Sequence, residues 1–304
     1  MSTSAIVISI VGVISSMFTL SMNIFLLNKV FGKTRKKEEM VMFYYRFAID
    51  VALGALVAAF LTFVVAYCVY SEEFREFHNF IFYLALPASN VGAVRSIVTL
   101  TITIERNLAA YTPIFFHNFR LLMPTSLILG FAVSFGLFED VVLFGLCNFK
   151  LDIPLNCAAF GCAINSCFFN YWTTHKSTIF AMTVISSILL CIKLFVLNRF
   201  GAKKSAELSR VNRLALLDAG NVCVFDFLPS FIANRWSQTP FFAFQNIGPY
   251  GAVAKLFGCA IEAFLVFRTL YRRSEQQKVS EASRSGNNRT LGKRISSVGV
   301  IQNA

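Results

Sequence analysis

The stretch VALGALVAAFLTFVVAYCVY, residues 51–70, contains no charged side chain and is long enough to cross a lipid bilayer as one helix. A bilayer core about 30 Å thick needs roughly 20 apolar residues for each helical crossing. The run does not alternate polar and apolar residues, as the strand of a membrane β-barrel would. The sequence therefore predicts a membrane-spanning helix from Tyr44 to Tyr70.

The composition of the whole chain agrees with a membrane protein. Of its 304 residues 56% are hydrophobic and only 14% are charged, whereas soluble domains average about 25% charged residues. The net charge of +12 would favour nucleic acid only if the Lys and Arg shared one solvated face. Here they sit in short loops between apolar runs, so lipid is the expected environment and no nucleic-acid partner is predicted.

Six further apolar runs resemble the first one. Their number and length predict an all-α membrane protein, a seven-transmembrane helix bundle formed by residues 1–271. Residues 272–304 are polar and nearly free of aromatic residues, which predicts a disordered cytosolic tail. The other predicted helices are Ala5 to Val30, Phe80 to Ile104, Leu121 to Leu146, Lys176 to Arg199, Arg213 to Ala233 and Ile247 to Tyr271.

The distribution of basic residues predicts the orientation of the bundle. Basic residues near helix ends are retained on the cytosolic side. Of the 28 Lys and Arg, 21 fall in the loops of one side and in the tail, and four, Lys176 among them, fall on the other side. Three more lie inside predicted helices. The sequence therefore predicts an N-terminus outside the cell and a C-terminus in the cytosol.

Several ionisable residues fall inside the predicted helices, where charge is costly and usually marks a paired or functional group. Counted from the outer helix ends, Asp226 and Lys255 lie about seven and eight residues deep, which predicts an ion pair. Asp50 is expected to be isolated. These charges either hold the helices together or form the region that contacts a ligand and switches the bundle. A second layer is predicted about 15 residues deep, with Arg95, Asp218 and Glu262.

Four cysteines fall in the second outer loop, at Cys147, Cys157, Cys162 and Cys167. Their spacing lacks the paired C-x2-C pattern of zinc sites, and a loop that faces the oxidising lumen favours disulfide bonds. Two bridges are expected. Their connectivity is left open because four cysteines allow three pairings. Cys68, near the outer end of its helix, is an alternative partner.

Pro229 interrupts the sixth predicted helix and should kink it by removing a backbone hydrogen bond. The kink is either a hinge or an ordinary feature of a membrane helix. The third helix closes on an acid followed by Arg, Glu105 and Arg106, which is either an interfacial charge pair or a functional motif.

Several stretches resemble nematode serpentine chemoreceptors of the SRBC class, relatives of the rhodopsin-like receptors, over nearly all of residues 1–271. The stretches are IERNLAAYTPIFFHNFR (104–120), LFEDVVLFGLCNFKLDIPLNC (137–157), CAINSCFFNYWTTHKS (162–177), NRLALLDAGNVCVFDFLPSF (212–231) and GPYG (248–251).

The resemblance implies a chemosensory G-protein-coupled receptor that binds an extracellular small molecule and activates a heterotrimeric G protein. Glu105 and Arg106 match the acid-Arg-Tyr signature of rhodopsin-like receptors, with Asn107 in place of the Tyr. In that family the acid holds the Arg at rest, and the freed Arg helps to bind the G protein. The N-P-x-x-Y and C-W-x-P motifs are missing, so only Glu105 and Arg106 are carried over. The implied location is the plasma membrane of sensory-neuron cilia.

Other functional classes find little support in the sequence. There is no phosphate-binding G-x-x-x-x-G-K-[ST] loop and no G-x-S-x-G elbow, and His78, His117 and His175 are assigned to separate loops. No enzyme activity, metal or cofactor is therefore expected. The alternative is a transporter or ligand-gated channel of the plasma membrane, which would use the intramembrane charges as a path. A transporter would show two inverted halves, and no internal repeat is detectable. A membrane scaffold without a ligand is the other alternative.

Overall fold

The regular secondary structure of the described residues is helical throughout. Within this described part of the chain, six helices are long and apolar enough to cross a membrane, and a shorter apolar helix, Gly220–Ile232, occupies the place of the sixth predicted span. This agrees with the predicted all-α membrane bundle. The computed structural model describes residues 3–33, 41–70, 72–122, 124–155, 157–199, 216–217, 220–236, 239 and 248–268.

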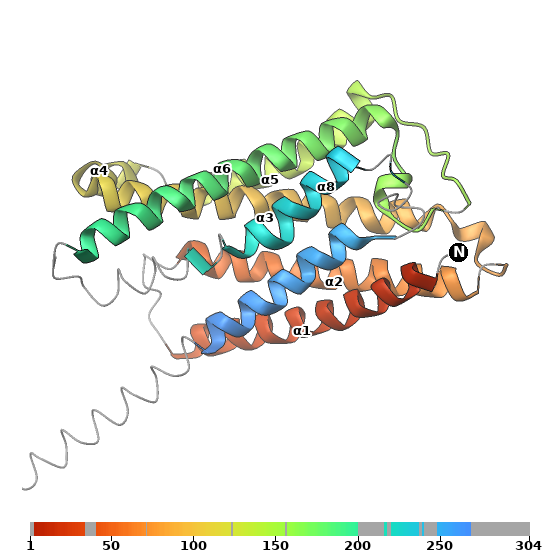
Figure 1. The fold of residues 1–304 in the computed structure, drawn as a ribbon, viewed down its shortest axis with the longest axis horizontal. Helices are drawn as coiled ribbons and strands as arrows, with labels where there is room; N and C mark the ends of the chain where they lie inside the picture. The colour runs from red at the N-terminus through yellow and green to blue at the C-terminus, as the bar shows by residue number, and fades with distance from the viewer. Residues whose placement is uncertain are drawn as a thin grey trace, which may run out of the picture. The chain divides into compact units, whose positions relative to one another are not determined.

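Figure 1 shows the helices coloured along the chain. The predicted tail, residues 272–304, lies outside the described residues. The site discussed below lies within the unit Met1–Ala263. The helices are α1 (Thr3–Lys33), α2 (Val41–Val69), α3 (Phe80–Tyr111), α4 (Pro113–Leu122), α5 (Thr125–Asp140), α6 (Ser166–Arg199), α8 (Leu228–Trp236) and the helix Tyr250–Arg268.

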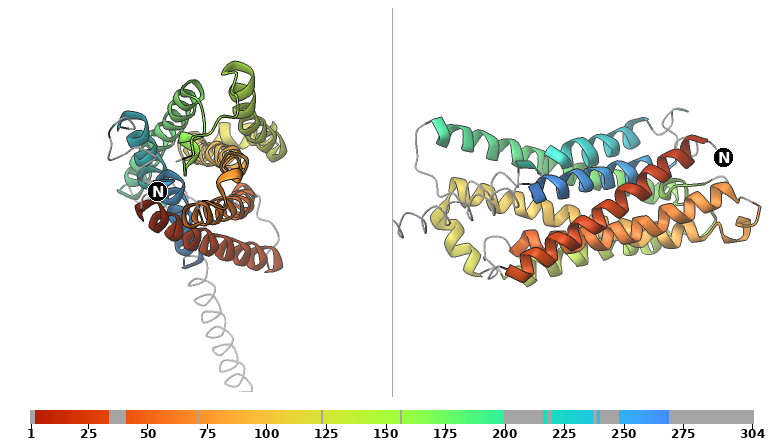
Figure 2. Two further views of the ribbon diagram at one scale, coloured as in Figure 1. Left: turned by 90° about the vertical axis from the view of Figure 1, so that its right-hand side faces the viewer. Right: turned by 90° about the horizontal axis from the view of Figure 1, so that it is seen from below.

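Helix α3 occupies the centre of the bundle. It packs against α2, α5 and α6, and the end-on view of Figure 2 shows it surrounded by other helices. Of its most apolar stretch 67% is buried, against 28% to 44% in the other five long helices. Polar side chains placed on α3 are therefore shielded from both water and lipid.

A glycine allows α5 to approach α3 closely. A Cβ atom added at Gly136 would lie 2.6 Å from Cγ2 of Val94 and 2.8 Å from the carbonyl oxygen of Asn90, both on α3. Contacts this short do not occur between real side chains and backbone, so only glycine fits here without a shift of one helix. This contact brings the polar residues near the end of α5 next to α3.

Helix α6 begins ten residues before the predicted start at Lys176. The side-chain oxygen of Asn165 accepts a hydrogen bond from the backbone N–H of Phe168 at 3.0 Å, which satisfies one of the free donors at a helix start. Phe168 is fully buried in the apolar core. The sequence places this segment in the second outer loop, but the cap and the buried aromatic side chains extend the helix over it.

The third predicted helix ends too early, and the fourth predicted helix, which starts at Leu121, begins before the observed start of α5 at Thr125. Helix α3 continues past Ile104 to Tyr111 and stops before Pro113. That proline opens a separate short helix, α4, which was not predicted. Proline fits at the first position of a helix because its missing N–H would have no partner there.

A π-helical turn, Cys223–Phe227, lies directly before the predicted kink at Pro229. Proline has no N–H to donate to the carbonyl group four residues earlier, that of Phe225. A wider turn accommodates such a loss, and π turns are common at functional sites. Asp226 lies inside this turn. The hinge itself stays a prediction.

Large apolar side chains cover the outside of the bundle. Ile14 on α1, Phe131 on α5 and Ile185 on α6 are each about 60% exposed, at 65%, 62% and 59%. An apolar surface of this extent is unusual on a soluble monomer and is the normal surface of a helix in contact with lipid.

Candidate functional site

Arg95 on α3 is the centre of a group of buried charged side chains. Its Nε donates a hydrogen bond to Oδ1 of Asp50 on α2 at 2.6 Å, and its Nη2 donates to Oε2 of Glu262 at 3.2 Å. Its Nη1 lies 3.5 Å from Oδ2 of Asp226. Because a guanidinium has five donors in a planar fork, this one residue connects carboxylates from three other helical segments.

Arg46 on α2 is the second arginine of the group. Its side chain is fully buried, and its Nη2 lies 2.7 Å from Oε2 of Glu262. Glu262 therefore accepts hydrogen bonds from Arg46 and from Arg95 at the same oxygen. This carboxylate links α2 and α3 to the last helix.

Lys255 and Asp226 form the pair that was predicted from their depth in the membrane. Nζ of Lys255 lies 3.0 Å from Oδ1 of Asp226, and it also lies 5.2 Å from the centre of the Phe180 ring. Since the other oxygen of Asp226 contacts Arg95, this carboxylate is shared by two cations.

These contacts form one connected set, called here the buried charge network. It contains three basic and three acidic side chains, so their formal charges cancel. Buried charges are tolerated inside a membrane protein only when they are paired in this way. Its members are Arg46, Asp50, Arg95, Asp226, Lys255 and Glu262.

The network corrects two expectations and leaves one open. Asp50 was expected to be isolated, which is wrong, because the long side chain of Arg95 reaches it across the α2–α3 contact. Arg46 is one of the 21 basic residues that the sequence places on the cytosolic side, but its side chain is buried in the first turns of α2. Asp218, the third member of the predicted second layer, lies outside the described residues.

A second buried group surrounds Glu139, near the end of α5. The carboxylate is fully buried and accepts a hydrogen bond from the Ser89 hydroxyl on α3 at 2.8 Å. From α6, His175 Nε2 lies 3.0 Å and Lys176 Nζ 3.7 Å from Oε1 of Glu139. Ser89 also accepts hydrogen bonds from Trp172 Nε1 at 2.8 Å and from Lys176 Nζ at 3.0 Å. Glu139 thus joins α3, α5 and α6.

The sequence did not predict this group around Glu139. His175 was assigned to a loop and Lys176 to the outer end of α6, because that helix was predicted to start too late. Glu139 lies well inside the predicted span Leu121 to Leu146, and a carboxyl group in an apolar span was the signal that could have found it. Among the described residues no three His, Cys, Asp or Glu are placed to hold a metal ion.

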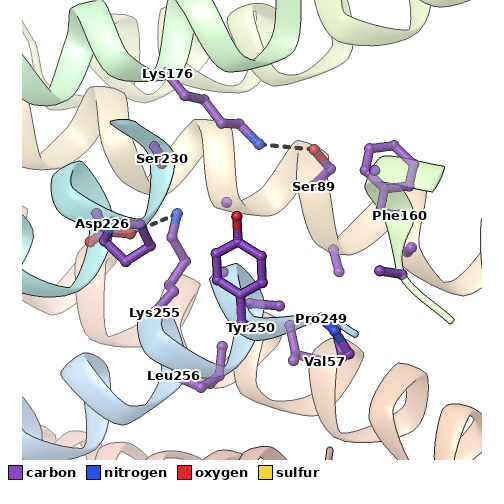
Figure 3. A pocket seen from close by; sticks show the side chains of 18 of the residues that line it. Val57, Ser89, Phe160, Lys176, Asp226, Ser230, Pro249, Tyr250, Lys255 and Leu256 are labelled. Carbon is purple, nitrogen blue, oxygen red and sulfur yellow. Dashed lines mark hydrogen bonds and ion pairs between the residues drawn. The ribbon is translucent and has the colours of Figure 1, made fainter. Parts of the chain in front are cut away.

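A cavity of about 120 Å³ lies between the two groups. Lys176 borders it from α6, and Lys255 and Asp226 border it from the opposite side; in Figure 3 the two lysines and the hydroxyl of Tyr250 converge on it. Gly92 on α3 also borders it, and an added Cβ atom there would make an ordinary contact with Lys255 Nζ at 3.7 Å. The remaining wall is mostly apolar and includes Leu53, Val57, Phe60, Ala85, Ala88 and Leu256.

The loop between α5 and α6 contributes to the wall of this cavity. Two disulfide bonds, Cys147–Cys167 and Cys157–Cys162, hold the loop. This confirms the expectation of two bridges and gives their pairing, while Cys68 stays a free thiol. Phe160 and Gly161, enclosed by the smaller bridge, line the cavity, and the Phe160 ring lies edge-on to Trp172 with 5.6 Å between ring centroids.

Glu105 and Arg106 lie near the other end of α3, and both are largely buried. Nη2 of Arg106 lies 3.9 Å from Oε2 of Glu105, which is a long ion pair. The next residue, Asn107, donates from Nδ2 to the carbonyl oxygen of Ser186 on α6 at 2.7 Å. The hydroxyl of Tyr111 donates to Leu189 of the same helix at 3.0 Å. This end of α3 is therefore fixed to α6.

A comparison with protein families gives a match over most of the chain. The model of the family described as serpentine type 7TM GPCR chemoreceptor Srbc matches residues 1–274. This match covers all the helices described above. No curated protein matches the chain.

Proposed function

The chain belongs to the Srbc family of serpentine-type seven-transmembrane chemoreceptors, and we propose that it binds an extracellular small molecule in the cavity between Lys176 and Lys255 and then activates a heterotrimeric G protein. The family is one of receptors and not of enzymes. The observation that carries the proposal is that Asp226 both lines the cavity and contacts Arg95 of the buried charge network. A ligand that changes the environment of Asp226 therefore acts on the contacts between four helical segments.

The proposed orientation has the N-terminus outside the cell. Figure 1 places the N-terminus and the disulfide-bonded α5–α6 loop at the same end of the bundle. Disulfide bonds form on the oxidising side of a membrane. The excess of Lys and Arg in the loops of the other side supports the same orientation. The cavity, whose wall includes Phe160 of this loop, is then nearer the outer surface.

Helix α3 connects the cavity to the cytosolic end in this proposal. Ser89 and Gly92 line the cavity, Arg95 lies in the network, and Arg106 follows about 16 Å further along the helix axis. A ligand shifts a two-state bundle only through its different affinity for the two states. Displacement of α3 against α6 would alter the setting of Glu105 and Arg106, which we propose as the coupling switch for the G protein.

The cellular setting completes the proposal. A chemoreceptor that detects external molecules acts at the plasma membrane, and we propose the cilia of sensory neurons as its location. A transporter or ligand-gated channel would instead need a continuous polar path, whereas the charged side chains of the network are paired with one another.

The test uses the full-length chain in cells with a G-protein activation readout. A panel of volatile and secreted small molecules is applied to the native chain, to Arg106→Ala and, as a control, to Arg75→Gln, whose side chain is exposed on a loop. We expect an activating compound whose response is lost in Arg106→Ala and kept in Arg75→Gln, with equal surface expression. A response that persists in Arg106→Ala would rule out the proposed switch.

A further inference from the structure

We propose that the ligand of the cavity carries an anionic group, and that it is a small carboxylate held between the ammonium groups of Lys176 and Lys255. This inference rests on the proposed function for its biological meaning, but the binding site itself can be tested without it. Its support comes from the charges at the cavity wall, from the free hydrogen-bond donors of Lys176 and from the size of the cavity.

The charges at the wall favour an anion. Lys176 and Lys255 both border the cavity, and Asp226 is the one carboxylate among the lining residues. Asp226 is already shared between Lys255 and Arg95, while Glu139 lies behind Lys176 and outside the lining. The two ammonium groups converge on the same cavity. An anion placed between them would lower their mutual repulsion, which is strong in a medium of low dielectric constant.

Lys176 has donors available for such a ligand. Its ammonium group has three N–H donors, and within the described residues it makes one hydrogen bond, to Ser89 at 3.0 Å. The nearest oxygen of Glu139 is 3.7 Å away, which is beyond hydrogen-bond distance. The side chain is only 9% exposed, so bulk water is a poor substitute partner.

Ser89 and Trp172 fix the position of this ammonium group. The Ser89 hydroxyl donates its proton to Glu139 and accepts from both Trp172 and Lys176, so its hydrogen-bonding capacity is filled. The Trp172 ring lies under the Lys176 cation with 4.3 Å between Nζ and the ring centroid. A group held by these two contacts presents its remaining donors to the cavity with little loss of entropy on binding.

The cavity sets the size of the ligand. Its volume of about 120 Å³ is close to that of an engineered cavity of about 150 Å³ that holds benzene. The ligand therefore has on the order of six non-hydrogen atoms. Leu53, Val57 and Leu256 would contact its hydrocarbon part. A short-chain carboxylate meets both requirements.

Such a ligand would compete with Asp226 for Lys255. When the ligand carboxylate takes over the Lys255 ammonium group, Asp226 is left with Arg95 as its partner among the contacts described here. Removing the competing charge by Asp226→Asn should therefore strengthen carboxylate binding, even though it removes a network contact. Tighter carboxylate binding together with lower stability of the protein in Asp226→Asn is expected only if the cavity binds an anion.

The experiment measures ligand-induced thermal stabilisation of the purified full-length chain in nanodiscs. The probes are butyrate, the neutral isostere butyramide and the cation butylammonium, with acetate, hexanoate and benzoate to vary size. We expect butyrate to bind at least about tenfold more tightly than butyramide, and butylammonium not to bind. Each neutralising variant, Lys176→Gln or Lys255→Gln, should weaken carboxylate binding about tenfold. Asp226→Asn should strengthen it.

Two further variants keep the test decisive. Lys176→Arg retains the charge and should retain part of the binding if Lys176→Gln fails to fold. Lys150→Gln, which removes an exposed charge of the α5–α6 loop, should leave binding unchanged. The proposal is overturned if butyrate and butyramide bind equally, if butylammonium binds preferentially, or if no carboxylate binds. It is also overturned if carboxylate binding survives both lysine substitutions.

The outcomes separate this inference from the proposed receptor function. Carboxylate binding that depends on Lys176, without any G-protein activation in cells, would keep the anion site and count against the receptor function. Activation by neutral compounds alone, abolished in Arg106→Ala, would keep the receptor function and overturn the anion site.

Discussion

Arg95 Nε and Asp50 Oδ1 lie 2.6 Å apart, and both side chains are almost completely buried between α2 and α3. This short, charge-assisted contact fixes the two helices relative to each other at the centre of the bundle. Removal of one partner from a buried ion pair leaves the other charge uncompensated, which is the costly case for buried charges.

Replacement of Arg95 by methionine should therefore strongly destabilise the protein. The change leaves Asp50, Asp226 and Glu262 each without one cation, and we expect a loss of about 3–5 kcal/mol. Thermal unfolding of the detergent-purified chain and its surface expression measure the effect. Arg235→Gln, on an exposed side chain at the end of α8, serves as the control. Equal melting temperatures for the two variants would contradict the central role of Arg95.

Asp226→Asn should destabilise the protein more than Lys255→Gln does. Asp226 contacts two cations, Lys255 at 3.0 Å and Arg95 at 3.5 Å, whereas Lys255 contacts this carboxylate and an aromatic ring. The double variant should cost less than the sum of the two single changes, because the shared contact is lost only once. A thermal-unfolding cycle of the four proteins measures the coupling. Strict additivity would show that the pair makes no net contribution.

Gly136→Ala should disrupt the contact between α3 and α5. The added methyl group would meet Val94 at 2.6 Å and the backbone of Asn90 at 2.8 Å, and overpacking of this kind costs about 1–3 kcal/mol. Gly130 is the matched control on the same helix, since a Cβ atom there has no neighbour within 4 Å. Gly130→Ala should be neutral or stabilise by up to about 1 kcal/mol. Relative to the native chain, the melting temperature should fall for Gly136→Ala and stay the same or rise for Gly130→Ala. An equal shift in both variants would refute the close packing of α3 and α5.

The two disulfide bonds should differ in their contribution to stability. Cys147 and Cys167 are 20 residues apart in sequence, and Cys157 and Cys162 are five apart. In the loop-entropy model a longer closed loop gives a larger stabilisation, here by roughly 1 kcal/mol. Replacing Cys147 and Cys167 together by Ala should therefore lower the melting temperature more than replacing Cys157 and Cys162. The reverse order would show that contacts of Phe160 within the small loop dominate.

Glu105→Gln should raise signalling without ligand, but only modestly. The Glu105–Arg106 contact is long, at 3.9 Å, which is beyond hydrogen-bond distance. A change of about 1 kcal/mol in a two-state equilibrium raises basal activity about fivefold. Basal G-protein activation normalised to surface expression measures it. Unchanged basal activity would indicate that the acid does not restrain Arg106.

The sequence predicted the long spans well because length and hydropathy alone define them. Prediction failed where a few polar residues masked a helix, as at the first turns of α6, whose start depends on the cap provided by Asn165. It also failed at Pro113, where a proline both ends α3 and begins α4. Such boundaries depend on single hydrogen bonds that hydropathy does not register.

The sequence predicted how deep the charged residues of the candidate site lie in the membrane, but not toward which neighbouring helix each side chain points. Counting residues along two helices was enough to pair Asp226 with Lys255. The same count could not connect Asp50 to Arg95, because it gives neither the face on which a side chain points nor the reach of a long arginine. Glu139 and Lys176 meet only through the packing of α5 and α6 on α3, which no local pattern in the sequence encodes.

The order of the six charged network residues along the chain constrains how the protein can be made. Arg46, Asp50 and Arg95 are synthesised first and together carry a surplus of one positive charge; Asp226, Lys255 and Glu262 come more than a hundred residues later and carry one surplus negative charge. A nascent chain that has delivered only its first helices to the translocon thus holds a cation whose partner has not yet been translated. We expect a chain truncated before the final helices to keep this uncompensated charge and therefore to be less stable in the membrane than the complete bundle.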